Sequence, residues 1–339
     1  MEKITFQEAL VQACMEEMRR DERVFLLGQD VGPFGGALQS TKGIWQEFGG
    51  SGRVIDTPIS EAAMVGLGIG AAMMGRRPIV EIMLGAFLPN AVSPIINDAA
   101  NVWYYTMGKA RAPMVIRIKF GWGPPLHAAM VNTEAFFVHV PGLKVVMPST
   151  PLDAKGLLKS AIRDDNPVLF FEHMYLYQGI KEEIPAQEYT IPLGVADVKR
   201  TGTDVTIVAT ALMVHRALSV AEKLSKNEKI EVEVLDLRTL VPLDRDAILK
   251  SVKKTGRLVV VHEAWKFGGM GGEIAAMVAE EAFDHLKSPI ARIGAPHVPI
   301  PYSQAFWKGF IPDEQKITEA VHKVLNRQSQ GLGNGRSAS

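Results

Sequence analysis

The sequence contains a single cysteine, Cys14, among 339 residues. A chain with one cysteine forms no internal disulfide and offers no cysteine cluster for zinc, as is typical of proteins from reducing compartments. It carries 37 basic and 37 acidic side chains and no polybasic run, so it lacks the positive surface that nucleic acid or an anionic membrane attracts. No uninterrupted apolar stretch reaches the roughly 20 residues that span a bilayer, and the first residues do not resemble a signal peptide. These absences predict a cytoplasmic protein.

Several catalytic signatures are missing as well. None of the eight histidines forms the His-Glu-x-x-His pattern of a zinc protease, and there is no Gly-x-Ser-x-Gly turn of a serine hydrolase. Glycine-rich segments occur at residues 66–70 and 268–272, but neither has the Lys-Ser/Thr pair of a phosphate-binding P-loop. Close helix packing is the favoured role of the first segment, and subunit contact is the favoured role of the second.

What is present is an alternation of short apolar runs with amphipathic stretches. This alternation predicts an α/β fold with mainly parallel sheets and helices on both faces, in two three-layer α/β/α domains. The first half has predicted strands at residues 24–27, 78–83, 113–118, 143–147 and 168–172, with helices at 90–105 and 151–163. The second half has strands at residues 205–209, 231–235 and 258–262, with helices at 211–224, 244–253 and 272–283.

The domain boundaries follow from changes in this pattern. Residues 1–185 form the first predicted domain, and residues 186–203 are charged, Pro-containing and irregular, as in a linker. Residues 204–327 form a second, smaller domain. The Gly/Ser/Asn-rich residues 328–339 have no apolar periodicity and are predicted to be disordered.

Glu61 is the candidate catalytic residue that the sequence singles out. It ends the segment 56–61 and precedes an apolar, glycine-punctuated run from Ala62 to Gly75. A carboxylate at the mouth of a buried segment must find a hydrogen-bond partner or have its pKa raised, and both outcomes suit acid/base chemistry. A solvated glutamate at a helix N-terminus is the alternative, and these residues alone leave both open.

Several ordered segments carry a resemblance to a known family. They are residues 28–36, 53–61, 77–81, 140–151, 153–158, 236–244 and 268–276. Over nearly its whole length the chain resembles the β subunit of the thiamine-diphosphate-dependent E1 component of 2-oxo acid dehydrogenase complexes, as in the pyruvate, branched-chain and acetoin enzymes. The resemblance implies a transketolase-type pyrimidine-binding domain followed by a transketolase C-terminal-type domain.

The resemblance assigns roles to individual residues. Glu61 matches the glutamate that hydrogen-bonds the aminopyrimidine ring of thiamine diphosphate and favours its imino tautomer. Ile59, Met83 and Phe87 match positions that line or stack on this ring, although apolar core packing would also explain them. Gln29 matches a residue of the cofactor-side loop, where the family usually has glutamate.

The resemblance also implies partners and metals. The Gly-Asp-Gly…Asn pattern that holds Mg²⁺ and the diphosphate is absent here, and in this family it belongs to an α subunit, which implies an α2β2 heterotetramer. Ala161, Asp164 and Asn166 match positions that bind a structural K⁺ in some relatives. Turn capping by the aspartate and asparagine is the alternative.

Departures from the family pattern leave the reaction open. Ala129 stands where relatives usually have a histidine that assists acyl transfer, so His127, two residues away, is the replacement candidate. Ala86 and Gln29 replace an aspartate and a glutamate. The favoured function is therefore decarboxylation of a 2-oxo acid, or cleavage of acetoin, with acyl transfer to lipoyl-E2. The alternative is a carboligase or decarboxylase that forms acyloins without acylating lipoamide, and a non-catalytic scaffold is a third reading.

Overall fold

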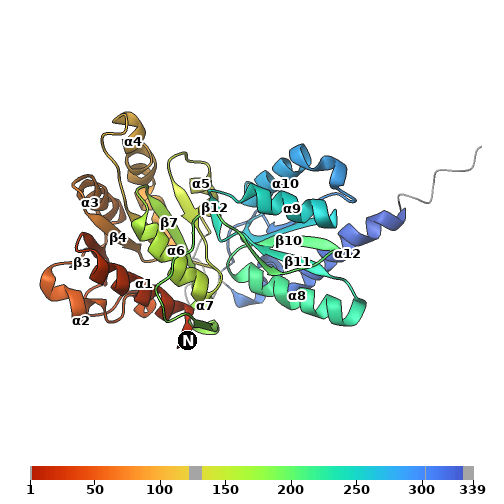
Figure 1. Cartoon of the computed structure of the whole chain (residues 1–339), viewed down its shortest axis with the longest axis horizontal. Coiled ribbons are helices and arrows are strands. Elements are labelled where there is room, and N and C mark those ends of the chain that lie inside the picture. Colours follow the sequence, from red (N-terminus) through yellow and green to blue (C-terminus); the bar gives the residue numbers. More distant parts are fainter. Residues whose placement is uncertain (1, 122–131, 302, 331–339) are drawn as a thin grey trace, which may run out of the picture. The chain divides into compact units, whose positions relative to one another are not determined.

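Residues 2–121, 132–301 and 303–330 are described in a computed structural model of the chain. Contacts divide the chain into two compact units (Figure 1). The first unit comprises the residues up to Gly194 together with Thr239–Pro242, and the second comprises Val195–Arg238 and the residues from Leu243 onward. Each unit is built on one sheet with helices on both faces, which confirms the predicted fold class.

The first unit contains a seven-stranded sheet with the order β12-β6-β7-β5-β4-β2-β3. Every neighbouring pair is parallel except β12 with β6. The strands β2, β5 and β7 are buried along their whole length, as expected for parallel strands covered on both faces. The strand bounds are β2 (Val24–Gly28), β3 (Val54–Asp56), β4 (Arg77–Ile82), β5 (Val115–Phe120), β6 (Lys144–Val146), β7 (Val168–His173) and β12 (Thr239–Val241).

The helices of the first unit begin with α1 (Phe6–Arg20), which the sequence predicts through a capping box. Thr5 Oγ1 accepts a hydrogen bond from the backbone N–H of Glu8 at 3.1 Å, and the Glu8 carboxylate accepts one from the Thr5 N–H at 2.7 Å. A short antiparallel pair, β1 (Glu2–Thr5) with β8 (Lys181–Ile184), lies outside the main sheet. The other helices are α2 (Ile44–Phe48), α3 (Glu61–Met73), α4 (Val102–Tyr105), α5 (Glu134–Val138), α6 (Pro151–Arg163) and α7 (Leu176–Gly179).

The predicted helix at residues 90–105 is wrong, because the structure breaks this segment into short pieces. A 3₁₀ helix (η3, Gly85–Ala91) is followed by a π-helical turn (η4, Pro94–Ala99) and then by α4. Pro89 and Pro94 lack the backbone N–H that an uninterrupted α-helix needs. Both η3 and η4 pack against α3, so the break folds the segment after β4 back toward Glu61.

The second unit contains a five-stranded sheet with the order β14-β13-β10-β11-β9, in which only β9 is antiparallel to its neighbour. Figure 1 shows α8 on one side of this sheet and α9 and α10 on the other. The strands are β9 (Asp197–Arg200), β10 (Val205–Ala209), β11 (Val232–Asp236), β13 (Leu258–Trp265) and β14 (Ala291–Ala295). The helices are α8 (Leu212–Glu228), α9 (Arg245–Thr255), α10 (Met270–Glu281), α11 (Trp307–Phe310) and α12 (Glu314–Gln330).

The structure shifts two predicted boundaries. The stretch 186–203 is not a linker throughout, because β9 lies within it and adds an edge strand beside β11. Helix α12 continues to Gln330, three residues into the stretch predicted to be disordered, since Gln and Ser do not by themselves end a helix; residues 331–339 lie outside the described part. Among the described residues, no helix is both long enough and apolar enough to cross a membrane.

Candidate active site

The strand order of the first sheet reverses at β2, and the predicted cofactor residues lie there. The chain passes from β2 to β3 on one side of β2 and then to β4 on its other side. In open parallel sheets, ligands bind at the carboxyl ends of the strands where the order reverses. Gln29 follows β2, Met83 follows β4, and Ile59 and Glu61 follow β3. The topology therefore brings the segments that carry these residues to the carboxyl ends of β2, β3 and β4.

Glu61 is a buried carboxylate at the carboxyl ends of these strands. It opens helix α3, and only 6% of its surface is exposed. Among the described residues its carboxylate accepts one hydrogen bond, from the side-chain amide of Asn90 at 3.3 Å, and Asn90 itself is exposed. A buried carboxylate with a single long hydrogen bond retains acceptor capacity for another group. The arrangement fits a ligand that donates a hydrogen bond to Glu61.

The surrounding predicted residues differ in burial. Met83 and Phe87 are partly buried, in the segment that starts after β4 and continues into η3. Gln29 is also partly buried, whereas Ile59 is 73% exposed. An isoleucine so exposed next to a buried carboxylate fits a surface that a ligand or a partner covers.

A buried charge network lies on neighbouring strands of the same sheet, and the sequence did not predict it. Glu81 of β4, Arg117 and Lys119 of β5 and Glu172 of β7 each have at most 1% exposure. Lys119 donates to Glu81 at 2.5 Å, and Arg117 donates two hydrogen bonds to Glu172, at 2.5 and 3.0 Å. A fully buried charge is tolerated only when it is paired in this way. Arg117 and Lys119, two positions apart in an otherwise apolar strand, were the available signal.

The network fixes its own ionisation. Burial alone would raise the pKa of Glu81, but Lys119 and Arg117 outweigh it and hold this pKa below its ordinary value. Burial acts against the charge of Arg117, yet Glu172 and Glu81 raise its pKa well above the usual range. Tyr177 donates to Glu172 at 2.5 Å, and burial together with that carboxylate raises the tyrosine pKa. Glu81 and Arg117 are therefore charged near neutrality, and Tyr177 is neutral.

The network also holds the loop after β2, which carries Gln29. Ser40, in this loop, donates to Glu81 at 2.6 Å. Gly36 has a φ of +75°, and a Cβ there would lie 2.7 Å from Ser40 Oγ and 3.2 Å from Glu81 Oε1. Only glycine fits this backbone conformation without strain. The loop therefore packs directly on the buried charges.

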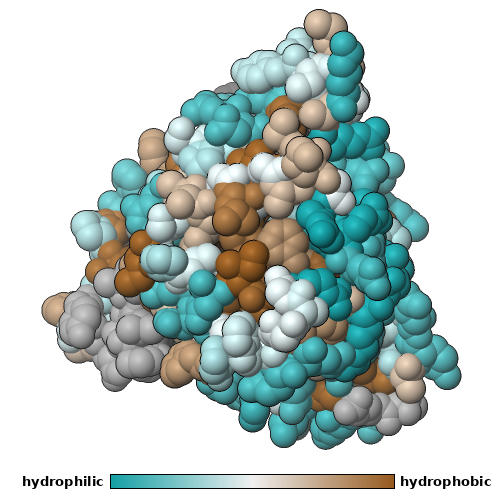
Figure 2. All heavy atoms as spheres, turned by 90° about the vertical axis from the view of Figure 1, so that its left-hand side faces the viewer, coloured by the Kyte–Doolittle hydropathy of each residue, from teal (hydrophilic) through white to brown (hydrophobic). Residues whose placement is uncertain are grey.

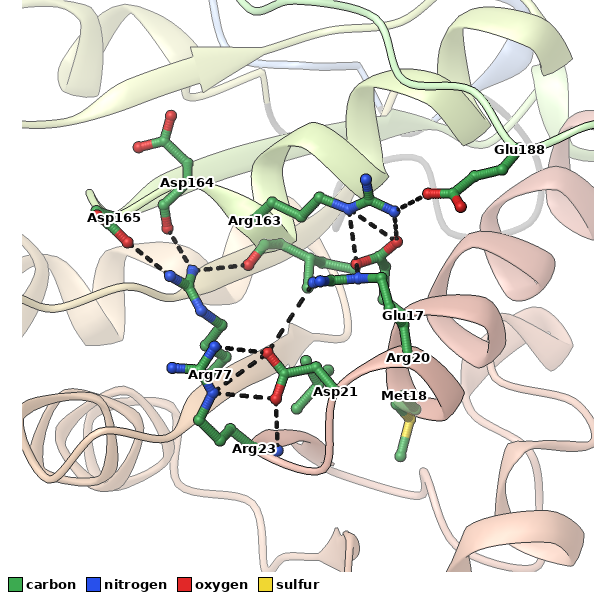
Figure 3. Close-up of polar contacts among 12 residues, drawn as sticks. Glu17, Met18, Arg20, Asp21, Arg23, Arg77, Arg163, Asp164, Asp165 and Glu188 are labelled. Atoms are coloured by element: carbon green, nitrogen blue, oxygen red, sulfur yellow. Dashed lines mark hydrogen bonds and ion pairs between the residues drawn. The ribbon is translucent and has the colours of Figure 1, made fainter.

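The predicted potassium residues lie at the end of α6, and Figure 3 shows one of them, Asp164. Asp164 Oδ1 accepts hydrogen bonds from the backbone and side-chain N–H groups of Asn166 at 2.9 and 3.0 Å, while Lys144 forms an ion pair with Oδ2. The Arg77 guanidinium donates to the carbonyl oxygen of Asp164 at 2.9 Å. Among the described residues, the carbonyl oxygen of Ala161 accepts one long hydrogen bond, at 3.3 Å, from the Asp164 N–H. Turn capping accounts for the Asp164 and Asn166 side chains, and the Ala161 carbonyl keeps a lone pair for a cation.

Two further predictions concern the residue that assists acyl transfer and the binding of a metal ion. His127 and Ala129 lie at 122–131, outside the described residues. Within the described residues, no group of three or more His, Cys, Asp or Glu side chains is placed to hold a metal ion.

Comparison with known proteins decides the family. Residues 2–179 match the pyrimidine binding domain of transketolase, and residues 194–317 match the transketolase C-terminal domain. The chain is 44% identical over 328 residues to the 2-oxoisovalerate dehydrogenase subunit beta of Bacillus subtilis, covering 96% of this chain and 99% of that protein. The chain belongs to the E1 β-subunit family of 2-oxo acid dehydrogenase complexes.

Other members of this E1 β-subunit family are equally similar. The pyruvate dehydrogenase E1 component subunit beta of B. subtilis is 43% identical over 330 residues, covering 96% of this chain and 99% of that protein. The acetoin:2,6-dichlorophenolindophenol oxidoreductase subunit beta of Cupriavidus necator is 45% identical over 336 residues, covering 95% and 98%. Among solved structures, a split-gene transketolase described as an inactive β4 tetramer aligns with a TM-score of 0.78 at 24% identity, covering 95% of this chain and 98% of that one. That last match shows the fold alone.

Proposed function

We propose that this E1 β subunit uses thiamine diphosphate, with an α subunit, to decarboxylate a 2-oxo acid or cleave acetoin and to pass the acyl group to lipoyl-E2. The observation that carries the proposal is the environment of Glu61. This residue begins helix α3 after β3, beside the strand β2 at which the strand order reverses. Its side chain is only 6% exposed, and among the described residues its carboxylate accepts one long hydrogen bond, from Asn90. The three similar subunits named above belong to dehydrogenases or an oxidoreductase, which favours this route over the carboligase alternative.

Glu61 is the proton-handling residue of this proposal. Bound thiamine diphosphate would supply a thiazolium carbon that attacks the substrate carbonyl once it has lost its proton. Glu61 would hydrogen-bond a ring nitrogen of the aminopyrimidine and hold the tautomer that removes this proton. Asn90 donates to this carboxylate through its side-chain amide at 3.3 Å and would help to orient it. Burial keeps water away from the carboxylate, which strengthens such a hydrogen bond.

The other predicted cofactor residues would position the ring. Met83 and Phe87 present partly buried apolar surface after β4, and Ile59 presents exposed apolar surface two residues before Glu61. Gln29 lies on the loop that Ser40 fastens to Glu81. This loop would hold its shape when the cofactor binds, because the buried ion pairs beneath it are already formed.

The proposed α partner would cover an apolar face of the first unit. Figure 2 shows hydrophobic surface on the face that lies at the left of Figure 1, where α3 and α4 are located. The exposed apolar side chains of α3 and its end include Leu67 at 46% and Met74 at 85%, and α4 adds Tyr104 at 75%. Exposed apolar surface of this kind marks protein contacts. We assign it to an α2β2 assembly in which the α subunit holds Mg²⁺ and the diphosphate.

Two finer parts of the proposal have their own measurements. If K⁺ binds at Ala161, Asp164 and Asn166, elemental analysis of the purified enzyme should detect bound potassium. Asp164→Ala should remove this potassium. Acyl transfer assisted by His127 predicts that His127→Ala lowers lipoyl acylation more than reduction of an artificial acceptor.

The decisive experiment measures 2-oxo acid turnover by the chain co-purified with its α partner, thiamine diphosphate and Mg²⁺. Turnover is followed first with an artificial electron acceptor and then with a free lipoylated domain. We expect both activities, and we expect Glu61→Gln to lower both at least 100-fold, in line with the loss of one acid/base group. Cofactor binding, measured by calorimetry, should persist in that variant.

A matched control separates the role of Glu61 from a general effect of removing an acid. Glu47 also lies in the first turn of a helix, α2, where it forms an exposed ion pair with Arg19 at 2.5 Å. Glu47→Gln should leave turnover within about twofold, since an exposed pair contributes little. Carbon dioxide release or acyloin formation without lipoyl acylation would refute the dehydrogenase route, and near-normal turnover by Glu61→Gln would refute the role of Glu61.

A further inference from the structure

The second unit has its own reversal of strand order. In its sheet β10 lies between β11 and β13, so the chain leaves β10 on one side through α8 and reaches the other side through α9 (Figure 1). The carboxyl ends of β10 and β13 are therefore the position where an open α/β sheet binds ligands. The glycine-rich loop between β13 and α10 lies at this position. Nothing in the proposed cofactor chemistry uses it.

The loop leads into a helix N-terminus without a side-chain cap. Helix α10 has 12 residues, and its N-cap residue, Gly269, offers no side chain to the first-turn N–H groups. Gly268 has a φ of +69°, which lets the backbone turn sharply into the helix. The Gly272 N–H donates to the Gly269 carbonyl oxygen at 2.9 Å, whereas the N–H groups of Met270 and Gly271 have no acceptor among the described residues. Free N–H groups and the helix dipole attract an anion.

A buried histidine points at this first turn. His262 of β13 is 6% exposed, and its Nδ1 lies 3.2 Å from the Ala264 carbonyl oxygen, an acceptor to which Nδ1–H donates. Its Nε2 is buried and has no hydrogen-bond partner among the described residues. A Cβ on Gly271, in the first turn of α10, would lie 2.9 Å from Nε2. Burial lowers the pKa of His262 to about 4, so at neutral pH Nε2 carries a lone pair.

An arginine that has no partner among the described residues lies on the same side of the sheet. Arg292 of β14 pairs in register with Val260 of β13, so its side chain shares the face of Val260 and His262. Its Nη1 lies 3.3 Å from the place that a Cβ on Gly272 would occupy. Arg292 forms no side-chain hydrogen bond or ion pair with any residue that the structure describes. A half-buried, unpaired guanidinium at a helix N-terminus is well placed to hold an oxyanion.

We propose that the first turn of α10, Arg292 and His262 form a binding site for inorganic phosphate. The Arg292 guanidinium and the free N–H groups of the helix donate to the charged oxygens. The Nε2 lone pair of His262 accepts from the hydroxyl group that phosphate keeps at neutral pH. Sulfate and carboxylates have no such proton, so the site should reject them. This site lies in the second unit and does not depend on the proposed catalytic function.

The experiment is calorimetric titration of the full chain, without an α subunit or cofactor, with inorganic phosphate at neutral pH. We expect one phosphate per chain and at least tenfold weaker binding of sulfate. Arg292→Ala, on the edge strand of the sheet, should weaken phosphate binding by roughly tenfold or more, as expected when a charged hydrogen bond is lost. His262→Gln should reduce the ratio of phosphate affinity to sulfate affinity, because the glutamine side chain can also donate a hydrogen bond to an oxygen of sulfate.

Arg245→Ala is the matched control. Arg245 forms an exposed ion pair with Glu281 at the other end of α10, so this variant removes one positive charge near the same helix. Phosphate affinity should remain within about twofold. The proposal is overturned by the absence of phosphate binding, by equal affinity for sulfate, by an unchanged affinity in Arg292→Ala, or by an equal loss in Arg245→Ala.

Discussion

The stability of the second unit should depend on pH through His262. In an unfolded chain this histidine titrates near its ordinary pKa of 6.5, whereas burial lowers its pKa to about 4 in the fold, with a smaller contribution from Arg292. Between these values the unfolded chain binds more protons than the folded one. The free energy of unfolding should therefore fall as the pH falls from 6.5 toward 4 and should not change through this group above 6.5. The difference corresponds to roughly 3 kcal/mol in full, of which about 2 kcal/mol is lost by pH 5.

Urea unfolding of the wild type and of His262→Gln, in phosphate-free buffer at pH 7.5 and pH 5, tests this reasoning. Other groups also titrate in this range, so the informative quantity is the difference between the two proteins in how much stability each loses. We expect the wild type to lose about 2 kcal/mol more than His262→Gln. His285→Gln, which changes a solvent-exposed histidine, should lose as much as the wild type. Equal losses in the wild type and His262→Gln would refute a buried, neutral His262.

Three substitutions test features of the first unit by urea denaturation. Thr5→Ala removes the capping box of α1 and should cost about 1 kcal/mol, and no change would contradict the reciprocal cap. Lys119→Met removes the ammonium group that pairs with the buried Glu81 carboxylate and should lower the free energy of unfolding by about 3–5 kcal/mol. Adding Glu81→Met should restore part of this stability, and a lack of rescue would argue against a paired network. Gly142→Ala should cost more than about 2 kcal/mol, because φ is +91° and the new Cβ would meet the Ala100 carbonyl oxygen; a variant as stable as the wild type would show that the turn can relax.

The apolar alternation predicted much of the fold. The strand expected at 168–172 is observed at Val168–His173, and that expected at 258–262 begins β13 at Leu258. A parallel core strand needs a nearly continuous apolar run, which is a signal that local sequence carries. The helix predicted at 90–105 was wrong because the prediction followed apolar side chains with helical spacing across Pro94. Pro94 has no backbone N–H, so it cannot donate the hydrogen bond that would continue an α-helix through this position.

The candidate site was predictable only in part. Glu61 stood out because a carboxylate next to an apolar run is rare, and the structure does bury it. The supporting ion pairs were not predicted, because charged residues are usually assigned to the surface. Their partners are far apart in the chain: Lys119 and Glu81 are 38 residues apart, and Arg117 and Glu172 are 55 residues apart. Only the register of three strands brings them together, and that register is a property of the whole sheet.

The strand β12 has a consequence for how the chain is made. It belongs to the first unit, where it pairs with β6 at the end of the sheet, yet its residues 239–241 come after the first three strands of the second unit in the sequence. During synthesis, residues up to 194 can form most of the first sheet, but β6 remains an open edge until residue 241 has been added. A fragment that ends at the 194/195 boundary would keep this edge permanently exposed. The first unit can therefore be completed only after part of the second has been synthesised, and the two cannot be separated at a single cut.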